Sequence, residues 1–558
     1  MGWAQAYAPL GSTALSALLA AAPLLILFGL LASGRFPSWA PALASTMAAL
    51  LLAVAAWRMP VLLALSAGVF GAAFALFPIL WIVIAALWVY NLSVESGQFA
   101  VIRATLSSIS GDRRLQALFI AFAFGAFLEG AAGFGTPVAI TAAMLVGLGF
   151  DARYAAAICL LANSSPVAFA AAGVPVEVAA EVSGLAVMRI SQIIGRQLPL
   201  LSLLVPLWLC VVLCGWRRSV EVLPAILVAG LSLALSQFLI ANLAGPWMTG
   251  VLSGLITMAA LALFLRVWKP RRVWDFPPSA SLRDARAAAL AGRPAEPAEP
   301  AAQKIPPLAV IRAWAPYLLM SIMVVLWGTG PVKRALAPAG LSFAWPLLNG
   351  AVLKTPPIVK ATSLYPAVFG FALLSAPGTA IFLAGALSTV FLPNLGIRKA
   401  AACLGRTVRS LRFTILTVCL VLATAYVMNY SGMSSSLGLA LAATGVLFPL
   451  FSPLLGWVGV LLTGSDTSSN ALFCSLQRTT AEQLGLDPGL MVAANTSGGV
   501  AGKMISPQSI SVATASTGLA GQEGWLFRFT IGHSIAMALI VSAITLVQAF
   551  LLPGMIPR

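Results

Sequence analysis

Charged side chains are scarce in this chain. Lysine, arginine, aspartate and glutamate together make up 8% of the 558 residues, whereas 60% of the residues are hydrophobic. Soluble globular domains carry about a quarter of charged residues, so this composition excludes them. The long apolar runs predict an all-α polytopic membrane protein with about 12–14 transmembrane segments. The first apolar run is long and follows no basic segment, so we expect a spanning helix there and not a cleaved signal.

Histidine and paired cysteines are also missing. The only histidine is His533, and the six cysteines show no C-x-x-C spacing. This excludes disulfide frameworks, bis-histidine haem and histidine-rich metal sites, so no metal or other cofactor is expected. The net charge of +17 does not indicate nucleic acid, because the basic residues form short clusters between apolar runs, as at Arg217 and Arg218. Such clusters follow from the positive-inside rule, and the expected partner is the lipid bilayer.

One segment of low hydrophobicity divides the chain. Residues 269–307 contain repeated prolines and a surplus of arginine, which predicts a flexible cytoplasmic linker. The linker separates a first membrane repeat, 1–268, from a second, 308–558. The polar stretch 331–366 should then face the opposite side of the membrane.

Two acidic residues stand apart from the other acids of the chain. Of the 15 acidic residues, all but Glu129 and Asp466 are expected in loops, in the linker or near segment ends. A charge at bilayer depth costs about 2.5–3.5 kcal/mol even on a lenient scale, so it is retained where it lines a polar cavity or a proton path. Burial also disfavours the ionised form of a carboxyl group, as proton loading and release require. Glu129 and Asp466 are therefore predicted to couple protons; the alternative is a permanent ion pair with Lys503 or an arginine.

The surroundings of Glu129 predict a re-entrant hairpin over residues 115–148. A helix over 115–128 would be only ~21 Å long, against a hydrocarbon core of ~30 Å. Joined to 134–148 it would reach ~50 Å, which tilting cannot absorb. We therefore expect two arms that meet near residues 129–135, the alternative being one long kinked helix. A second hairpin is expected over 448–484, around Asp466.

The two halves of the chain carry matching features. Asn-Ser-Ser-Pro at 163–166 and Asn-Thr-Ser-Gly at 495–498 are predicted to interrupt broken helices over 154–173 and 489–515. The distance from the buried acid to a following Gly-x-Asp aspartate is 22 residues in one half (151 minus 129) and 21 in the other (487 minus 466). Arginines flank the first hairpin far more than the second, which favours two inverted repeats, each with a re-entrant hairpin and a broken helix.

Interrupted helices free backbone amides and hydroxyl groups to hold an anion, helped by the positive ends of half-helix dipoles. The substrate is therefore expected between the hairpin tips and the broken helices. The predicted substrate-binding residues are Gly133, Gly135, Thr136, Asn163, Ser164, Ser165, Ser465, Thr467, Ser468, Asn470, Asn495, Thr496, Ser497, Lys503, Ser506 and Gln508. Candidates for lining the cavity are Tyr90, Asn91, Asn429, Tyr430 and His533. Lys503 could instead extend to the membrane interface, and His533 and the tyrosines could be structural.

Three motifs carry a family resemblance: Leu-Glu-Gly-Ala-Ala-Gly-Phe-Gly-Thr-Pro at 128–137, Gly-Ser-Asp-Thr-Ser-Ser-Asn at 464–470 and Gly-Lys-Met-Ile-Ser-Pro-Gln at 502–508. Together they resemble the lactate permease family of bacterial 2-hydroxymonocarboxylate transporters, over about residues 10–553. The resemblance implies proton-coupled uptake of L-lactate, D-lactate or glycolate across the inner membrane. It also implies kinship with the ion-transporter superfamily, whose members have inverted repeats and paired hairpins and in which a hairpin-bearing domain moves like an elevator.

Three alternatives stay open at this stage. Sodium could replace the proton as the coupling ion, although the tips at 163–166 and 495–498 differ from the superfamily's sodium-site pattern. A proton-translocating subunit of a respiratory complex would also bury acids and a lysine. An intramembrane enzyme is disfavoured, because no G-x-S-x-G motif accompanies the single histidine.

Overall fold

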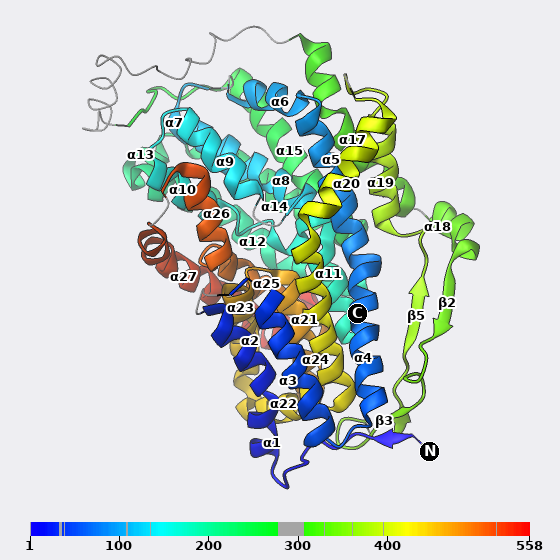
Figure 1. The fold of residues 1–558 in the computed structure, drawn as a ribbon. Helices are drawn as coiled ribbons and strands as arrows, with labels where there is room; N and C mark the ends of the chain where they lie inside the picture. The colour runs from blue at the N-terminus through cyan, green and yellow to red at the C-terminus, as the bar shows by residue number, and fades with distance from the viewer. Residues whose placement is uncertain are drawn as a thin grey trace.

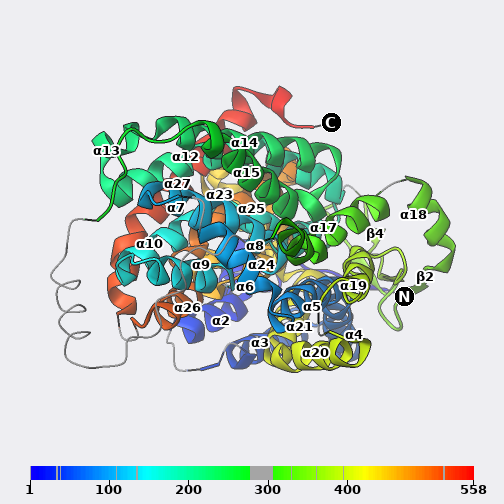
Figure 2. The same ribbon diagram turned by 90° about the horizontal axis from the view of Figure 1, so that it is seen from above.

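The all-α architecture is confirmed by a computed structural model (Figures 1 and 2). The structure describes residues 2–32, 36–37, 39–107, 110–133, 136–276, 306–328, 330–359, 361–393, 395–519 and 522–557. Within these ranges, 10 helices are long and apolar enough to cross a membrane, and one further pair is bent by 67°. Three shorter apolar helices accompany them, Trp39–Ala55, Pro137–Gly147 and Pro377–Ser388. The predicted number of 12–14 crossings is reached only if some of these shorter or bent helices also cross the membrane.

The helices fall on both sides of the central segment. Before it lie α1 (Thr13–Ala20), α2 (Ala22–Ala32), α3 (Trp39–Ala55), α4 (Val61–Phe74), α5 (Trp81–Glu95), α6 (Gln98–Ser107), α7 (Arg113–Gln116), α8 (Gly125–Ala131), α9 (Thr136–Gly147), α10 (Ala152–Ala162), α11 (Ala170–Ser183), α12 (Val187–Cys214), α13 (Trp216–Val220), α14 (Leu223–Leu243) and α15 (Pro246–Val267). After it lie α17 (Pro307–Gly328), α18 (Gly330–Leu336), α19 (Pro377–Ser388), α20 (Ile397–Ser410), α21 (Arg412–Ser431), α22 (Met433–Leu441), α23 (Phe448–Thr463), α24 (Asp466–Leu484), α25 (Pro488–Lys503), α26 (Pro507–Thr517) and α27 (Glu523–Phe550). Of the predicted linker 269–307, residues 277–305 lie outside the described residues.

Short strands in and around the polar stretch 331–366 form two separate small sheets, of which β2 and β5 run alongside the helix bundle (Figure 1). The strands are β1 (Trp3–Ala4), β2 (Leu341–Ala344), β3 (Val352–Lys354), β4 (Ser363–Leu364) and β5 (Val368–Phe371). β3 pairs in parallel with β1, Trp3 opposite Val352, and antiparallel with β4; β2 pairs antiparallel with β5. β3 lies at the end of the molecule that holds α1 and α22, whereas α6, α7 and α13 lie at the other end (Figure 1).

A buried arginine gathers the basic loops at the α7 end. The Arg114 guanidinium donates to Asp112 at 2.7 Å and to Glu221 at 2.8 Å. It also donates to the backbone carbonyls of Arg218 and Arg272, at 2.8 and 2.9 Å. Arginine-rich segments far apart in the sequence therefore meet at one end of the molecule.

The chain reverses direction after Glu129. α7, a π-helical segment (Ala117–Phe124) and α8 form one buried run that ends at Ala131. Gly133 then has φ = +60°, a conformation that favours glycine. α9 packs back against α8 and the π-helical segment, so the two arms lie side by side.

A second reversal follows α23. Gly464 has φ = +71°, and the Ser465 hydroxyl then accepts a hydrogen bond from the Ser468 amide at 3.3 Å, which caps the start of α24. α23, α24 and α25 pack on one another. The tip between α23 and α24 is therefore a tight turn, and Asp466 is the first residue of the helix that follows it.

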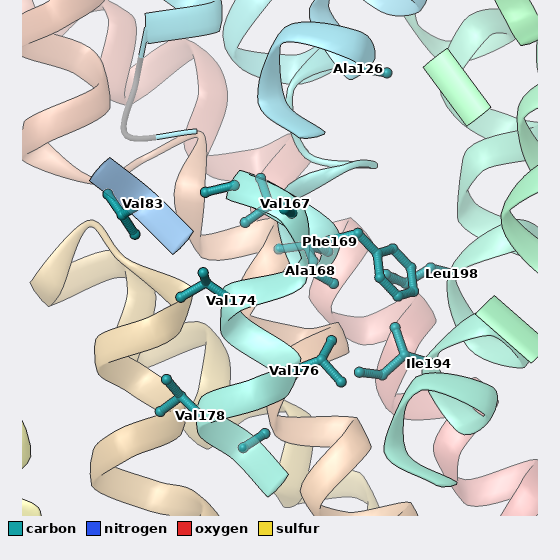
Figure 3. Packing of buried hydrophobic residues seen from close by; sticks show 14 of the residues in the cluster. Val83, Ala126, Val167, Ala168, Phe169, Val174, Val176, Val178, Ile194 and Leu198 are labelled. Atoms are coloured by element: carbon teal, nitrogen blue, oxygen red, sulfur yellow. The ribbon is translucent and has the colours of Figure 1, made fainter. Parts of the chain in front are cut away.

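The first predicted helix break is present, and it is sharper than a simple kink. α10 ends at Ala162, a turn and a 3-10 segment (Val167–Phe169) follow, and α11 leaves at 67° to α10. Ala171 and Ala172 both have positive φ, 43° and 57°, which costs a non-glycine residue on the order of 1–3 kcal/mol and is typical of functional sites. Figure 3 shows α11 after this bend, with Val176 pointing toward Ile194 of α12.

The second break is not where the sequence suggested. The predicted interruption at 495–498 is wrong, because α25 runs unbroken from Pro488 to Lys503. The break falls at residues 504–506, before Pro507, which disfavours the helical conformation of Ser506 and starts α26. The small residues at 495–499 serve close packing instead: a Cβ at Gly498 would overlap the Pro453 carbonyl of α23, and one at Gly456 would overlap the Asn495 carbonyl.

This packing predicts a stability defect. We expect Gly498→Ala to lower the stability of the fold by about 1–3 kcal/mol, because the added methyl must displace the α23 backbone. The matched control is Gly532→Ala in α27, where a Cβ has no neighbour within 4 Å. The measurement is the thermal unfolding midpoint of the detergent-purified protein. Equal midpoints for both variants would contradict the packing argument.

Candidate functional site

The two hairpin tips line one small cavity. From the tips it is lined by Glu129, Gly133, Gly464, Ser465, Asp466 and Thr467; from the bent pair by Val167, Ala170, Ala171 and Pro175; and from α25 and α26 by Lys503 and Gln508. Its volume is about 30 Å³. That is room for one to a few waters, at roughly 10–15 Å³ each, and not for an organic acid. A ligand can therefore enter only if the tips or the bent pair move apart.

Lys503 lies between the two acids. Its side chain is 5% exposed, and its Nζ donates to the Gly464 carbonyl at 2.7 Å. Its charge interacts with those of Glu129 and Asp466, yet among the described residues no carboxylate lies within 4 Å of it. The lysine thus points into the protein and does not extend to the membrane interface. It also forms no direct ion pair with either acid in this conformation.

Both acids have unsatisfied oxygens. Glu129 is 1% exposed and Asp466 is 3% exposed. In the described part of the chain, Oε2 of Glu129 and both carboxylate oxygens of Asp466 have no hydrogen-bond partner. Buried polar atoms are normally paired, so these oxygens mark positions for a proton, a water or a ligand.

Helix N-termini add positive potential to the cavity. α24 begins at Asp466 and α26 at Pro507, and each is capped by a serine, Ser465 or Ser506. Ser465 and Gln508 both line the cavity, so both helix ends face it. The free amides of such ends favour an anion, which adds to the charge of Lys503.

Several predicted substrate-binding residues are not part of the cavity lining. The buried Asn163 lies near the Glu129 carboxylate, but among the described residues its amide atoms and the Ser164 hydroxyl have no partner by hydrogen-bond geometry, whereas the Ser165 hydroxyl is hydrogen-bonded to that of Ser202. The Ser497 hydroxyl, on the unbroken α25, is also buried without a partner within the described ranges. Gly135 and the side chain of Thr136 lie outside the described residues. Of the predicted set, Gly133, Ser465, Thr467, Lys503 and Gln508 line the cavity.

Asn470, Asn495 and Thr496 bond to one another. Asn495 Nδ2 and Thr496 Oγ1 donate to Asn470 Oδ1 at 2.9 and 3.2 Å. Asn470 Nδ2 donates to the Pro175 carbonyl of α11 at 2.9 Å, and Gln477 Nε2 to Asn495 Oδ1 at 3.1 Å. This network ties the second hairpin and α25 to the bent α11, so these side chains position the cavity wall.

The predicted cavity-lining residues divide into two groups. His533 Nδ1 accepts a hydrogen bond from Trp208 at 3.0 Å, Tyr90 packs against Phe99, and Asn91 donates to Thr407 at 2.8 Å, all away from the cavity. Asn429 and Tyr430 line a second, larger cavity.

The sequence reading missed some features. The cavity is also lined by Ala170, Ala171 and Pro175. These apolar residues could not be recognised as lining residues in the sequence, because only the bend in the chain brings them to the cavity. The expectation that only two acids lie inside membrane segments is wrong for Glu177, which is within α11. The predicted broken helix ended at Gly173, where the backbone is indeed non-helical, but a further helical stretch follows this kink and reaches Ser183.

Membrane-length helices that enclose two acids and a lysine at the meeting point of two hairpin tips define a membrane transporter. The chain matches the family model for L-lactate permease over residues 16–552, and it belongs to that family. It is 47% identical to glycolate permease GlcA of Escherichia coli K12, covering 99% of both chains. It is 46% identical to the L-lactate permeases of E. coli K12 and Bacillus subtilis 168, covering 100% of each chain. The protein is a permease and not an enzyme, and a multi-pass protein of the bacterial inner membrane.

Proposed function

We propose that this permease carries lactate and glycolate by symport with a proton. The single observation that carries the proposal is the buried group Glu129, Lys503 and Asp466, which combines a cation for the carboxylate with two acids that have free oxygens. Support for the substrates comes from the full-length relatives named L-lactate permease and glycolate permease. L-lactate, D-lactate and glycolate share a carboxylate beside a hydroxyl group, and the cavity offers groups for both.

The charge balance of the site favours a proton as the coupling ion. With both acids ionised and Lys503 protonated, the site carries one net negative charge. A bound carboxylate would add a second, which is costly in a low-dielectric interior. If one proton binds Glu129 or Asp466 together with the substrate carboxylate, the net charge of the site returns to one negative charge. The loaded and the empty carrier then have the same charge. The substrate carboxylate would then contact Lys503 and the N-termini of α24 and α26.

The two halves of the chain, 1–268 and 308–558, act in this proposal as inverted repeats joined by the linker 269–307. The supporting observation is that two reversals of the chain, after Glu129 and before Asp466, bring their tips to one cavity. The small volume of that cavity fits an occluded state. Movement of the hairpins against the bent pair, as in an elevator, would open it to either side.

Purified protein in liposomes tests the function. We expect a pH gradient that is acidic outside the vesicles and alkaline inside to drive accumulation of radiolabelled L-lactate, and we expect D-lactate and glycolate to compete. An uncoupler should abolish accumulation, and replacing sodium by choline should leave it unchanged. Sodium-dependent accumulation that survives the uncoupler would instead establish the sodium-coupled alternative. Failure of the protein alone to transport would favour a role as a subunit of a larger complex.

A further inference from the structure

A second cavity lies at the far ends of α11 and α24. Its volume is about 440 Å³, within the ~300–1,000 Å³ typical of small-molecule sites. Its lining includes Glu181 from α11, Arg478 from α24, Lys354 from β3 and the tyrosines Tyr365, Tyr426 and Tyr430. Unlike the central cavity, it has room for an organic acid in the conformation described.

Lys354 supplies a cation without an ion-pair partner. Its Nζ lies 3.9 Å from the centroid of the Tyr365 ring, and within the described ranges no carboxylate approaches it to 4 Å. The nearby Glu482 pairs with Arg478 and not with Lys354, because its carboxylate accepts a hydrogen bond from Arg478 Nε at 2.7 Å. Burial lowers the pKa of Lys354, and the charge of Arg478 lowers it further, against a smaller opposing effect of Glu482. A bound anion would relieve this cost of holding the ammonium charged.

Arg478 and the tyrosines form a fixed wall around this ammonium group. Arg478 Nη1 donates to the Ser183 carbonyl at 2.6 Å, which holds the end of α11 against α24. The rings of Tyr365 and Tyr430 stack at 4.2 Å, and the Tyr430 hydroxyl donates to the Pro366 carbonyl at 2.7 Å. The Tyr426 hydroxyl donates to Glu181 at 3.4 Å. The wall therefore holds the Lys354 ammonium beside fixed aromatic rings, while both carboxylates of the lining, Glu181 and Glu482, are engaged by Tyr426 and Arg478.

Two helices connect this cavity to the central one. α11 and α24 pack side by side. α24 lines the central cavity with Asp466 and the second cavity with Arg478, and α11 does so with Ala171 and Glu181. At ~1.5 Å per residue, the twelve residues from Asp466 to Arg478 span about 18 Å. The second cavity thus lies about 18 Å from the proton-coupling site along two helices that pack side by side.

We propose that this cavity is a second binding site for the transported 2-hydroxymonocarboxylate, in which Lys354 holds the carboxylate before the acid passes along α11 and α24 to the central site. This inference rests on the proposed function. A site of this kind raises the local concentration of substrate at the entrance, so it acts on the apparent affinity of uptake and not on the rate at saturation.

Uptake kinetics in proteoliposomes test this role. We expect Lys354→Gln to raise the KM for L-lactate by roughly tenfold, the worth of one charge-assisted hydrogen bond, with Vmax unchanged. Lys354→Arg should keep the wild-type KM, because it retains the charge. The control is Arg58→Gln, which removes an exposed cation from the turn between α3 and α4, outside the cavity lining, and should change neither constant. A fall in Vmax at unchanged KM would assign Lys354 a structural role and overturn the proposal.

A labelling experiment measures occupancy directly. Lys354→Cys should react with a membrane-impermeant thiol reagent, and L-lactate should slow that reaction where equal sodium chloride does not; the unsubstituted protein gives the background of the native cysteines. If the wild type transports lactate but neither the KM nor the labelling rate responds as stated, the second site is wrong and the proposed function stands. If the wild type does not transport lactate or glycolate at all, the proposed function itself fails.

Discussion

Glu129→Gln is expected to abolish uphill accumulation of lactate while leaving exchange of lactate for lactate. The amide occupies nearly the volume of the carboxyl group but cannot take up and release a proton. Without that proton transfer, the pH gradient cannot drive the transport of lactate. Exchange needs no net proton movement, and the amide resembles the protonated acid. The measurement is radiolabelled L-lactate accumulation under an imposed pH gradient, compared with counterflow in vesicles preloaded with unlabelled lactate.

The matched control for this variant is Glu95→Gln. Glu95 lies at the end of α5, where it pairs with Arg406 at 2.6 Å on the surface, and its replacement should leave both assays unchanged. Asp466→Asn, tested in parallel, identifies the proton carrier: the acid whose amide variant exchanges but does not accumulate. If Glu129→Gln still concentrates lactate as the wild type does, Glu129 does not couple the proton. If Asp466→Asn then shows the split, the role belongs to Asp466.

The sequence located the charged centre because acids and lysines are so rare in apolar segments. Glu129, Asp466 and Lys503 stand out against their neighbours, and the structure places all three around one cavity. The bend after Asn163 was likewise visible from its proline. In both cases a local feature carries a large cost in a membrane helix, so its presence has few explanations.

The same reasoning failed where tertiary packing decides the conformation. Glycine and serine at 495–499 look like a helix break, yet they allow α25 to approach α23 closely, as at Gly498 beside Pro453. The second cavity could not be foreseen, because Lys354, Tyr430 and Arg478 come from segments far apart in the chain and no local pattern links them.

Lys503→Gln should differ from Glu129→Gln in the exchange assay, because the two residues serve different ligands in the proposed mechanism. Loss of the ammonium group removes the cation that faces the substrate carboxylate and leaves two acids that repel it. We therefore expect both uphill accumulation and exchange to fall, with the apparent affinity for lactate weakened roughly 10- to 100-fold, as for loss of a charge-assisted hydrogen bond. The measurement is counterflow as a function of lactate concentration.

The Lys503 result must be separated from loss of fold, because Nζ also donates to the Gly464 carbonyl at the hairpin tip. Lys503→Arg provides the comparison: it keeps the charge, but its planar fork does not fit a cavity of about 30 Å³, so partial exchange is expected. Thermal midpoints of both variants should lie near that of the wild type if the lysine acts on the ligand. A stable Lys503→Gln protein with wild-type exchange would show that the carboxylate is held elsewhere, leaving the N-termini of α24 and α26 as the anion partners. If exchange is kept in Glu129→Gln but lost in Lys503→Gln, the two results together separate proton coupling from anion binding within one cavity.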